Sequence, residues 1–222
     1  ADENRPVATP SSTSSPSATP TATPSTTATP TVTTPPPPPV ITPPDTTPTD
    51  TSKKSTGVPK GTKLTRHNGD LVISKQGQVV DGLEVHGSIS VRAPGVVIKN
   101  TRVIGVRELK TGLIASRSTG LTVRDSEIYS EHRNPTTNGV MGSNFTLDGV
   151  EIRDVVDQVH IHGAGNVTIK DSWLHSNVHY TNDPNWGGKP SHDDNIQIVS
   201  GSNISITGNR LAGAHNAAVM IT

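Results

Sequence analysis

Apolar and polar residues alternate in a short phrase that recurs along the second half of the chain. Its copies read GVVIKNTRVIG from Gly95, GLTVRDSEIYS from Gly120, NFTLDGVEIRD from Asn144, NVTIKDSWLHS from Asn166 and NISITGNRLAG from Asn203, and a looser copy, QVVDGLEVHG, begins at Gln78. The apolar residue before the turn in each copy is Val80, Ile98, Val123, Leu147, Ile169 or Ile206. Successive copies are therefore 18, 25, 24, 22 and 37 residues apart, and such a repeat indicates a stacked solenoid.

Each copy predicts two short β-strands, because its residues alternate on both sides of a small turn residue. That turn residue is Gly82, Asn100, Asp125, Gly149, Asp171 or Gly208, and these residue types tolerate a left-handed backbone. A further strand precedes most copies, at Ile89–Arg92, Leu113–Ser116, Val140–Gly142, Val159–His162, Asn195–Val199 and Ala218–Thr222. Three strands per coil around Val, Ile and Leu predict an all-β chain folded as a parallel β-helix, a solenoid of three-stranded coils. No segment of useful length has the apolar spacing of an α-helix.

Three copies begin with Asn144, Asn166 or Asn203 and match the N-x-S/T pattern of N-glycosylation. Their recurrence at one corner of successive coils has a simpler explanation. Asparagine suits the turn, and β-branched residues suit the strand that follows. We therefore interpret these residues as part of the repeat.

The composition changes sharply near Gly57. Fourteen of the nineteen prolines precede residue 50, whereas no glycine or aromatic residue does. A Pro/Thr/Ser-rich segment has too little apolar surface to offset the entropy of ordering it, so residues 1–56 are predicted to be a disordered linker or stalk. An O-glycosylated spacer and an unmodified linker both fit this composition. Residues 57–222 are predicted to form the β-helix domain.

Charge and composition exclude several classes of partner. The formal net charge is zero with no basic stripe, which argues against nucleic acid. No window approaches twenty apolar residues, so no membrane span is expected. The absence of cysteine rules out thiol catalysis and disulfides. A start at Ala1 fits a mature secreted chain without its signal peptide, and Ala218–Thr222 reads as the first strand of a new coil, so a truncated C-terminus is expected.

Two segments outside the repeat indicate kinship. The run GVPKGTKLTRHNGDLVISKQGQVVDGLEVHG from Gly57, the repeated VxIKN-like phrase and HDDNIQIVSG from His192 resemble actinobacterial-type secreted right-handed parallel β-helix proteins of the pectin-lyase-like superfamily. The resemblance covers residues 57–222. It implies a right-handed coil and a polysaccharide groove along the outer face of the first sheet. Because this superfamily contains lyases, hydrolases, epimerases and non-catalytic binders, the reaction stays open.

Histidines gather around an insertion that stretches the last interval to 37 residues. Seven of nine lie between His132 and His215, and the insertion spans His175 to Asp194. If Ile161 pairs with Ile198 and both point inward, side-chain alternation turns the neighbouring polar residues outward. The predicted solvent-facing patch consists of Asp157, His160, His162, His192, Asp194 and Gln197. The pairing also predicts His160 beside Gln197, Asp157 beside Asp194 and His215 near His192.

Roles follow from residue type. His192 or His160 is the candidate acid/base, and Lys189 is the candidate stabiliser of developing negative charge. The candidate substrate-binding residues are His162, Gln197, Asn195, Tyr180 and Trp186, with the two aromatic rings as platforms for sugars. Trp173 is expected to cap the edge of the core.

Metal sites are weaker candidates. Asp157 and Asp194, with Asp183 and Asp193 nearby, are candidate Ca²⁺ ligands, since calcium prefers several oxygen donors. A zinc site from His160, His162 and His192 is an alternative.

These observations predict a secreted, monomeric carbohydrate-active protein. Its expected location is extracellular, either free or associated with the cell wall. The first hypothesis is a polysaccharide lyase-like enzyme that binds an acidic, plant-derived or microbial polysaccharide in the groove of the first sheet. The alternative is a non-catalytic glycan-binding or cell-envelope protein, in which the stalk presents the solenoid. Release of unsaturated uronates distinguishes the two.

Overall fold

The computed structural model describes residues 55–222. The predicted linker, residues 1–56, lies almost wholly outside them. Twenty short strands and one 3₁₀ helix, η1 at Pro184–Trp186, make up the described part of the chain. The strands form three sheets, and every pairing between named strands is parallel.

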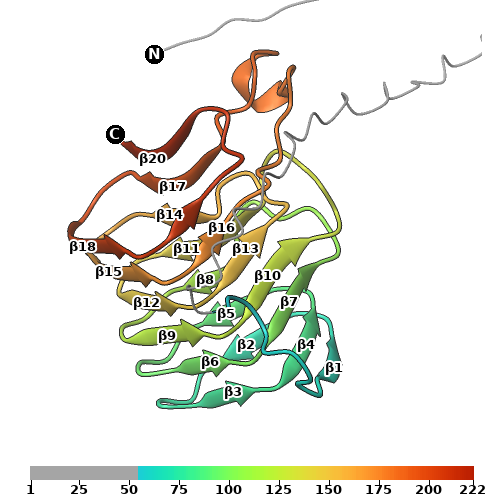
Figure 1. The fold of residues 1–222 in the computed structure, drawn as a ribbon, viewed down its shortest axis with the longest axis vertical. Coiled ribbons are helices and arrows are strands. Elements are labelled where there is room, and N and C mark those ends of the chain that lie inside the picture. Colours follow the sequence, from blue (N-terminus) through green and yellow to red (C-terminus); the bar gives the residue numbers. More distant parts are fainter. Residues whose placement is uncertain (1–54) are drawn as a thin grey trace, which may run out of the picture. The chain divides into compact units, whose positions relative to one another are not determined.

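The three sheets take one strand each from successive coils (Figure 1). The β1–β19 sheet contains β1 (Thr65–Asn68), β4 (Leu83–His86), β7 (Arg102–Gly105), β10 (Glu127–Ser130), β13 (Glu151–Arg153), β16 (Trp173–Leu174) and β19 (Arg210–Leu211). The β2–β20 sheet contains β2 (Leu71–Ile73), β5 (Ile89–Val91), β8 (Gly112–Ser116), β11 (Asn138–Gly142), β14 (Val159–Ile161), β17 (Asp194–Ile198) and β20 (Ala217–Ile221). The β3–β18 sheet contains β3 (Val79–Asp81), β6 (Val97–Lys99), β9 (Leu121–Arg124), β12 (Phe145–Asp148), β15 (Gly165–Lys170) and β18 (Ser202–Thr207). The predicted all-β parallel β-helix is confirmed.

The predicted turn residues lie between the β3–β18 and β1–β19 sheets, and all six have a positive φ. The angles are 68° at Gly82, 47° at Asn100, 47° at Asp125, 65° at Gly149, 51° at Asp171 and 68° at Gly208. An L-residue with a branched side chain is strained at such an angle, whereas Asn, Asp and Gly adopt it readily. The recurrence of these three types is therefore explained by the corner that each coil must turn.

A ladder of asparagine side chains stacks at another corner. Asn166 Nδ2 donates to Asn144 Oδ1 at 3.0 Å, and Asn203 Nδ2 donates to Asn166 Oδ1 at 3.1 Å. All three residues have a positive φ, between 51° and 57°. The structural explanation of the recurring N-x-S/T pattern is thus supported by both the backbone angle and the stacked amides.

The core is one continuous cluster of aliphatic side chains. Ile98, Val123, Leu147 and Ile169 are fully buried on consecutive coils, as the alternation predicts. The predicted register between the last coils is also confirmed, because Ile161 pairs with Ile198 and His160 pairs with Gln197.

This register predicts a large and a small loss of stability at adjacent positions of β15. Ile169→Asp buries an unpaired carboxylate between two coils and is expected to cost several kcal/mol of unfolding free energy. Thr168→Asp changes a half-exposed residue that pairs with Thr146 and Ser205, so its cost is expected to stay within about 1 kcal/mol. Denaturant unfolding of both variants tests this, and equal destabilisation would contradict the inward placement of Ile169.

Candidate functional site

The predicted insertion is present between β16 and β17, where residues 175–193 leave the coil and carry η1 (Figure 1). Buried hydrogen bonds anchor its base. Asn177 Nδ2 donates to Val156 O at 2.8 Å and to Asp194 O at 3.0 Å. Farther out, Asp183 and Lys189 form an antiparallel bridge, and Asp183 Oδ1 accepts from Asn185 N at 2.8 Å to cap η1. The loop is therefore held at both its base and its tip.

His160 lies on the outer face of the β2–β20 sheet, and its ring contacts a buried carboxylate. Its Nδ1 is 3.4 Å from Oδ2 of Asp157, whose side chain is buried. The other oxygen of Asp157, Oδ1, accepts from the backbone N of Asp194 at 2.9 Å. The Nε2 atom of His160 makes no hydrogen bond within residues 55–222. A buried carboxylate thus orients the ring and leaves one nitrogen available.

His162 is the next outward residue, and its ring meets that of His160 edge-on with centroids 6.0 Å apart. Partial burial, followed by the charges of His160 and Arg117, lowers the pKa of His162. Each of these effects disfavours the imidazolium. The ring is therefore held in its neutral form at neutral pH.

A hollow of about 260 Å³ opens beside His162 on the same outer face. Its lining residues are Lys110, Thr111, Ala115, Ser116, Arg117, Met141 and His162. Met141 pairs with His160 across β11 and β14, so the hollow adjoins the His160–Asp157 pair. Two cations and a neutral imidazole line this depression.

A second histidine–carboxylate pair lies one coil farther along. Asp194 is completely inaccessible to solvent, and its Oδ1 accepts from Asn216 Nδ2 at 2.7 Å. Its Oδ2 is buried without a hydrogen bond, 3.2 Å from His192 Nδ1. Asn216 Nδ2 also lies 3.0 Å from His192 Nε2, so both ring nitrogens of His192 face protein groups. Burial raises the pKa of Asp194, and the nearby charge of Asp157 adds to this effect, although Asn216 and His192 oppose it.

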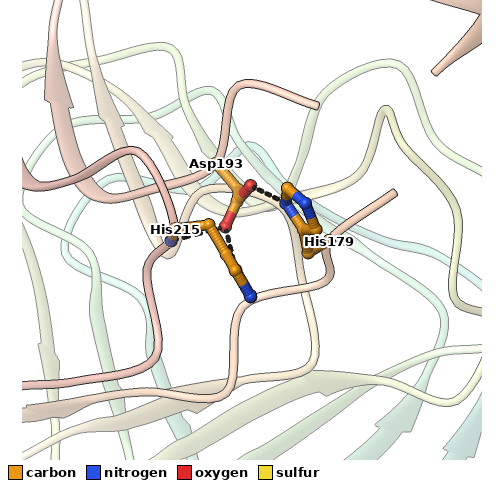
Figure 2. A group of neighbouring side chains, drawn as sticks. All are labelled: His179, Asp193 and His215. Carbon is orange, nitrogen blue, oxygen red and sulfur yellow. Dashed lines mark hydrogen bonds and ion pairs between the residues drawn. The ribbon is translucent and has the colours of Figure 1, made fainter. Parts of the chain in front are cut away.

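A third cluster joins the insertion to the last described coil (Figure 2). The buried carboxylate of Asp193 lies 2.7 Å from His179 Nδ1 through Oδ1 and 3.0 Å from His215 Nδ1 through Oδ2. The two imidazole rings stack with centroids 3.9 Å apart. Sequence reasoning missed this cluster, because His179 lies in an irregular loop whose conformation no repeat predicts.

Four predicted site residues are buried. This corrects the expectation that Asp157 and Asp194 face solvent, and the expectation that Asn195 and Tyr180 contact a substrate. Asp157 and Asp194 do not face solvent. Asp194 Oδ1 accepts from Asn216 Nδ2, and Asp157 Oδ1 accepts from the backbone N of Asp194 in the next coil. Asn195 is also buried, because its Nδ2 donates to Gln158 Oε1 and to the carbonyl of Ala212. Tyr180 packs against Val156 and Val178, so its ring is unavailable to a polysaccharide.

The other predicted residues are accessible. Gln197 is half-buried on the outer face, and Lys189 is exposed without an ion pair to any carboxylate in the described range. The side chain of Trp186 is 54% exposed, with its ring centroid 5.6 Å from that of His192. Trp173 does not cap the core as expected; it lies half-buried between His175, on which it stacks, and the guanidinium of Arg210.

Calcium does not fit the predicted ligands. It requires about six to eight oxygen donors, but three of the four oxygens of Asp157 and Asp194 are hydrogen-bonded, and the fourth, Asp194 Oδ2, lies 3.2 Å from His192 Nδ1. Asp183 and Asp193 are likewise engaged, by η1 and by two histidines. Among the described residues, the only group of three or more potential ligands that converge is His179, Asp193 and His215. The alternative zinc ligands His160, His162 and His192 do not converge as a group in that range.

Comparisons of the chain with protein-family models, with curated proteins and with solved structures found no match. Within residues 55–222, no helix has the length and apolar character needed to cross a membrane.

Asp194 generates a prediction about stability and pH. Because burial raises its folded-state pKa above the ordinary value of 3.8, ionisation opposes folding, and the contribution of Asp194 to stability falls as pH rises from 3.8 through the raised pKa. Asp194→Asn removes this ionisation, so its stability relative to the wild type should increase over the same pH interval. Denaturant unfolding between acidic and neutral pH measures the difference.

Asp81 provides a control of opposite sign. Hydrogen bonding from Asn100, followed by Lys99, lowers the pKa of Asp81, so its contribution is present above 3.8 and is lost as pH falls. Asp81→Asn should therefore lose stability relative to the wild type as pH rises. If Asp194→Asn followed the same trend as Asp81→Asn, the burial of an ionised Asp194 would not be opposing the fold.

Proposed function

We propose that the chain is a secreted carbohydrate-active protein, and that it acts as a lyase on an anionic polysaccharide bound along the outer face of the β2–β20 sheet. The observation that carries this proposal is the His160–Asp157 pair beside a hollow that Lys110 and Arg117 line. The resemblance to pectin-lyase-like proteins, in which the groove follows the equivalent sheet, agrees with this location.

The charge of the hollow supports an acidic sugar as substrate. Arg117 offers a planar guanidinium that matches a carboxylate in two parallel hydrogen bonds, and Lys110 adds a second positive charge. The neutral ring of His162, between these cations and His160, adds hydrogen-bonding capacity without further charge. A uronate unit would therefore place its carboxylate among the cations and its ring beside His160.

The chemistry follows from this placement. In β-elimination a base removes the C5 proton, electron density moves toward the sugar carboxylate, and the C4–O bond breaks. Nε2 of His160 would receive the proton while Asp157 stabilises the resulting imidazolium. Arg117 and Lys110 would neutralise the enolate-like charge, in the role first assigned to Lys189. The departing sugar oxygen takes a proton from water, and the product carries a C4–C5 double bond.

His192 fits the role of base less well than His160. Its Nε2 already faces the amide of Asn216 at 3.0 Å, whereas Nε2 of His160 has no such partner in the described part of the chain. His192 lies beside the exposed ring of Trp186, a combination that suits a neighbouring sugar subsite. We assign His192 to substrate positioning.

A non-catalytic glycan-binding function is the second candidate. It is favoured by Trp186, because a large aromatic ring kept in solvent on an anchored loop provides a stacking surface for sugars without any catalytic group. Under this proposal the same hollow would recognise acidic glycans and leave them intact.

Incubation with a panel of uronate-containing polysaccharides tests the lyase proposal, with ultraviolet absorbance of unsaturated products as the readout. His160→Gln is expected to lower kcat by about 100-fold or more, the usual contribution of a general base. Arg117→Gln is expected to lower kcat/KM for acidic substrates, because it removes a cation that faces the uronate carboxylate.

His86→Gln is the matched control, since His86 also lies next to an acidic residue, Glu84, but on the β1–β19 sheet. Its activity should equal that of the wild type. Failure of every polysaccharide to react would refute the lyase proposal, and retention of glycan binding in the same panel would then support the second candidate.

A further inference from the structure

His179, Asp193 and His215 converge from three separate segments of the chain (Figure 2). His179 lies early in the insertion, Asp193 lies at its end, and His215 lies in the connection between β19 and β20. One nitrogen from each imidazole and one oxygen of the carboxylate lie within 4.8 Å of one another. Because these residues are far apart in sequence, only the stacking of the last coil on the insertion brings them together.

The backbone around the cluster is fixed by its own hydrogen bonds. Asn216 N donates to Asp193 O at 3.2 Å, which links the two coils. Ser191 N donates to Tyr180 O at 2.8 Å, and Tyr180 N donates to Ser191 Oγ at 2.9 Å, which links the two ends of the loop. The three side chains are therefore positioned by the fold and not only by each other.

A buried carboxylate lies against two imidazoles in this cluster. Asp193 is fully buried, and each of its two oxygens contacts one ring of a stacked pair whose centroids are 3.9 Å apart. A divalent cation binds a carboxylate oxygen and the lone pair of a neutral imidazole nitrogen, so all three side chains are potential ligands of one ion.

We propose that His179, Asp193 and His215 form a binding site for a divalent transition-metal ion of the Zn²⁺ type. Two imidazole nitrogens and one carboxylate oxygen are a ligand set that zinc accepts, with a fourth position open to water. Calcium and magnesium prefer oxygen donors and are disfavoured here.

The side chains must rearrange when an ion binds. Tetrahedral zinc with bonds of about 2.0–2.1 Å separates its ligand atoms by about 3.3 Å. The two Nδ1 atoms face different oxygens of Asp193, at 2.7 Å for His179 and 3.0 Å for His215, and the rings are stacked, so at least one ring must rotate before both nitrogens face the same ion. Both histidine side chains are partly exposed, at 13% and 27%, which gives an ion a path to the buried carboxylate.

This site is separate from the proposed catalytic pair. Asp193 and Asp194 are consecutive, but Asp194 contacts His192 and Asn216, and the potential metal ligands include neither. An ion bound here would join the insertion to the coil that contains β20. Its role would be to hold the wall of the site in place.

Titration of the metal-free full chain with Zn²⁺ tests the proposal, with calorimetry for stoichiometry and long-range ¹H–¹⁵N spectra for the histidine nitrogens. We expect one ion per chain, with coordination shifts at Nδ1 of His179 and His215. His215→Gln, which changes a partly exposed side chain, and Asp193→Asn should each weaken binding by about 100-fold, since each removes one of three ligands. Ca²⁺ at the same concentrations should produce no such shifts.

His192→Gln is the matched control, because it removes an adjacent histidine that contacts Asp194 instead of Asp193. Its zinc affinity should equal that of the wild type, whatever the polysaccharide assay shows. Absence of stoichiometric binding, or binding that survives both His215→Gln and Asp193→Asn, would overturn the proposal. A loss in His192→Gln as large as that in His215→Gln would place the ion at the other carboxylate and would also overturn it.

Discussion

The structure depends on the direct stacking of each coil on the one before it. Parallel pairing places equivalent residues of successive coils side by side, so Ile98, Val123, Leu147 and Ile169 form one buried column. This stacking requires each coil to turn at the same corner, and the left-handed residues at those corners make that possible. Burial of aliphatic surface is the main driving force for folding. Each coil contacts only its neighbours, so this surface is buried between successive coils.

The same stacking of coils also positions the side chains of the candidate site. Outward residues also form columns, so Met141, His160 and Gln197 lie next to one another on the outer face of the β2–β20 sheet. The polar residues at the start of β17 are exceptions, because the insertion enters the coil there. Asp194 and Asn195 are both buried, and their side chains are accommodated by hydrogen bonds to polar groups of adjacent coils. The interior is therefore polar where the insertion joins the solenoid, and the proposed catalytic pair lies above that region.

The sequence predicts those structural features that recur from coil to coil. Alternation and the six turn residues suffice to predict the strands, the fold and the pairing of His160 with Gln197, because these features depend on local preference and period. The same rule placed Asp157 and Asp194 at the solvent, whereas both carboxylates are buried and accept hydrogen bonds from backbone and amide donors of adjacent coils. His179 and Arg117 were not assigned to a site, because their positions depend on the path of a non-repeating loop and on which residues surround the hollow. Sequence spacing contains no signal for either.

Asp193 and Asp194 face His215 and Asn216 across the last coils, and this arrangement would connect the proposed metal site to the proposed polysaccharide site. Asp193 contacts His215, while Asp194 contacts Asn216, the next residue along. A displacement of either segment as a whole would therefore change both contacts, because consecutive residues are covalently joined. An ion bound by Asp193 and His215 would fix the separation of these two segments. It would thereby also fix the position of Asn216, on which the orientation of His192 depends. The metal site would act on a polysaccharide only through this backbone connection, without contact between the ion and the sugar.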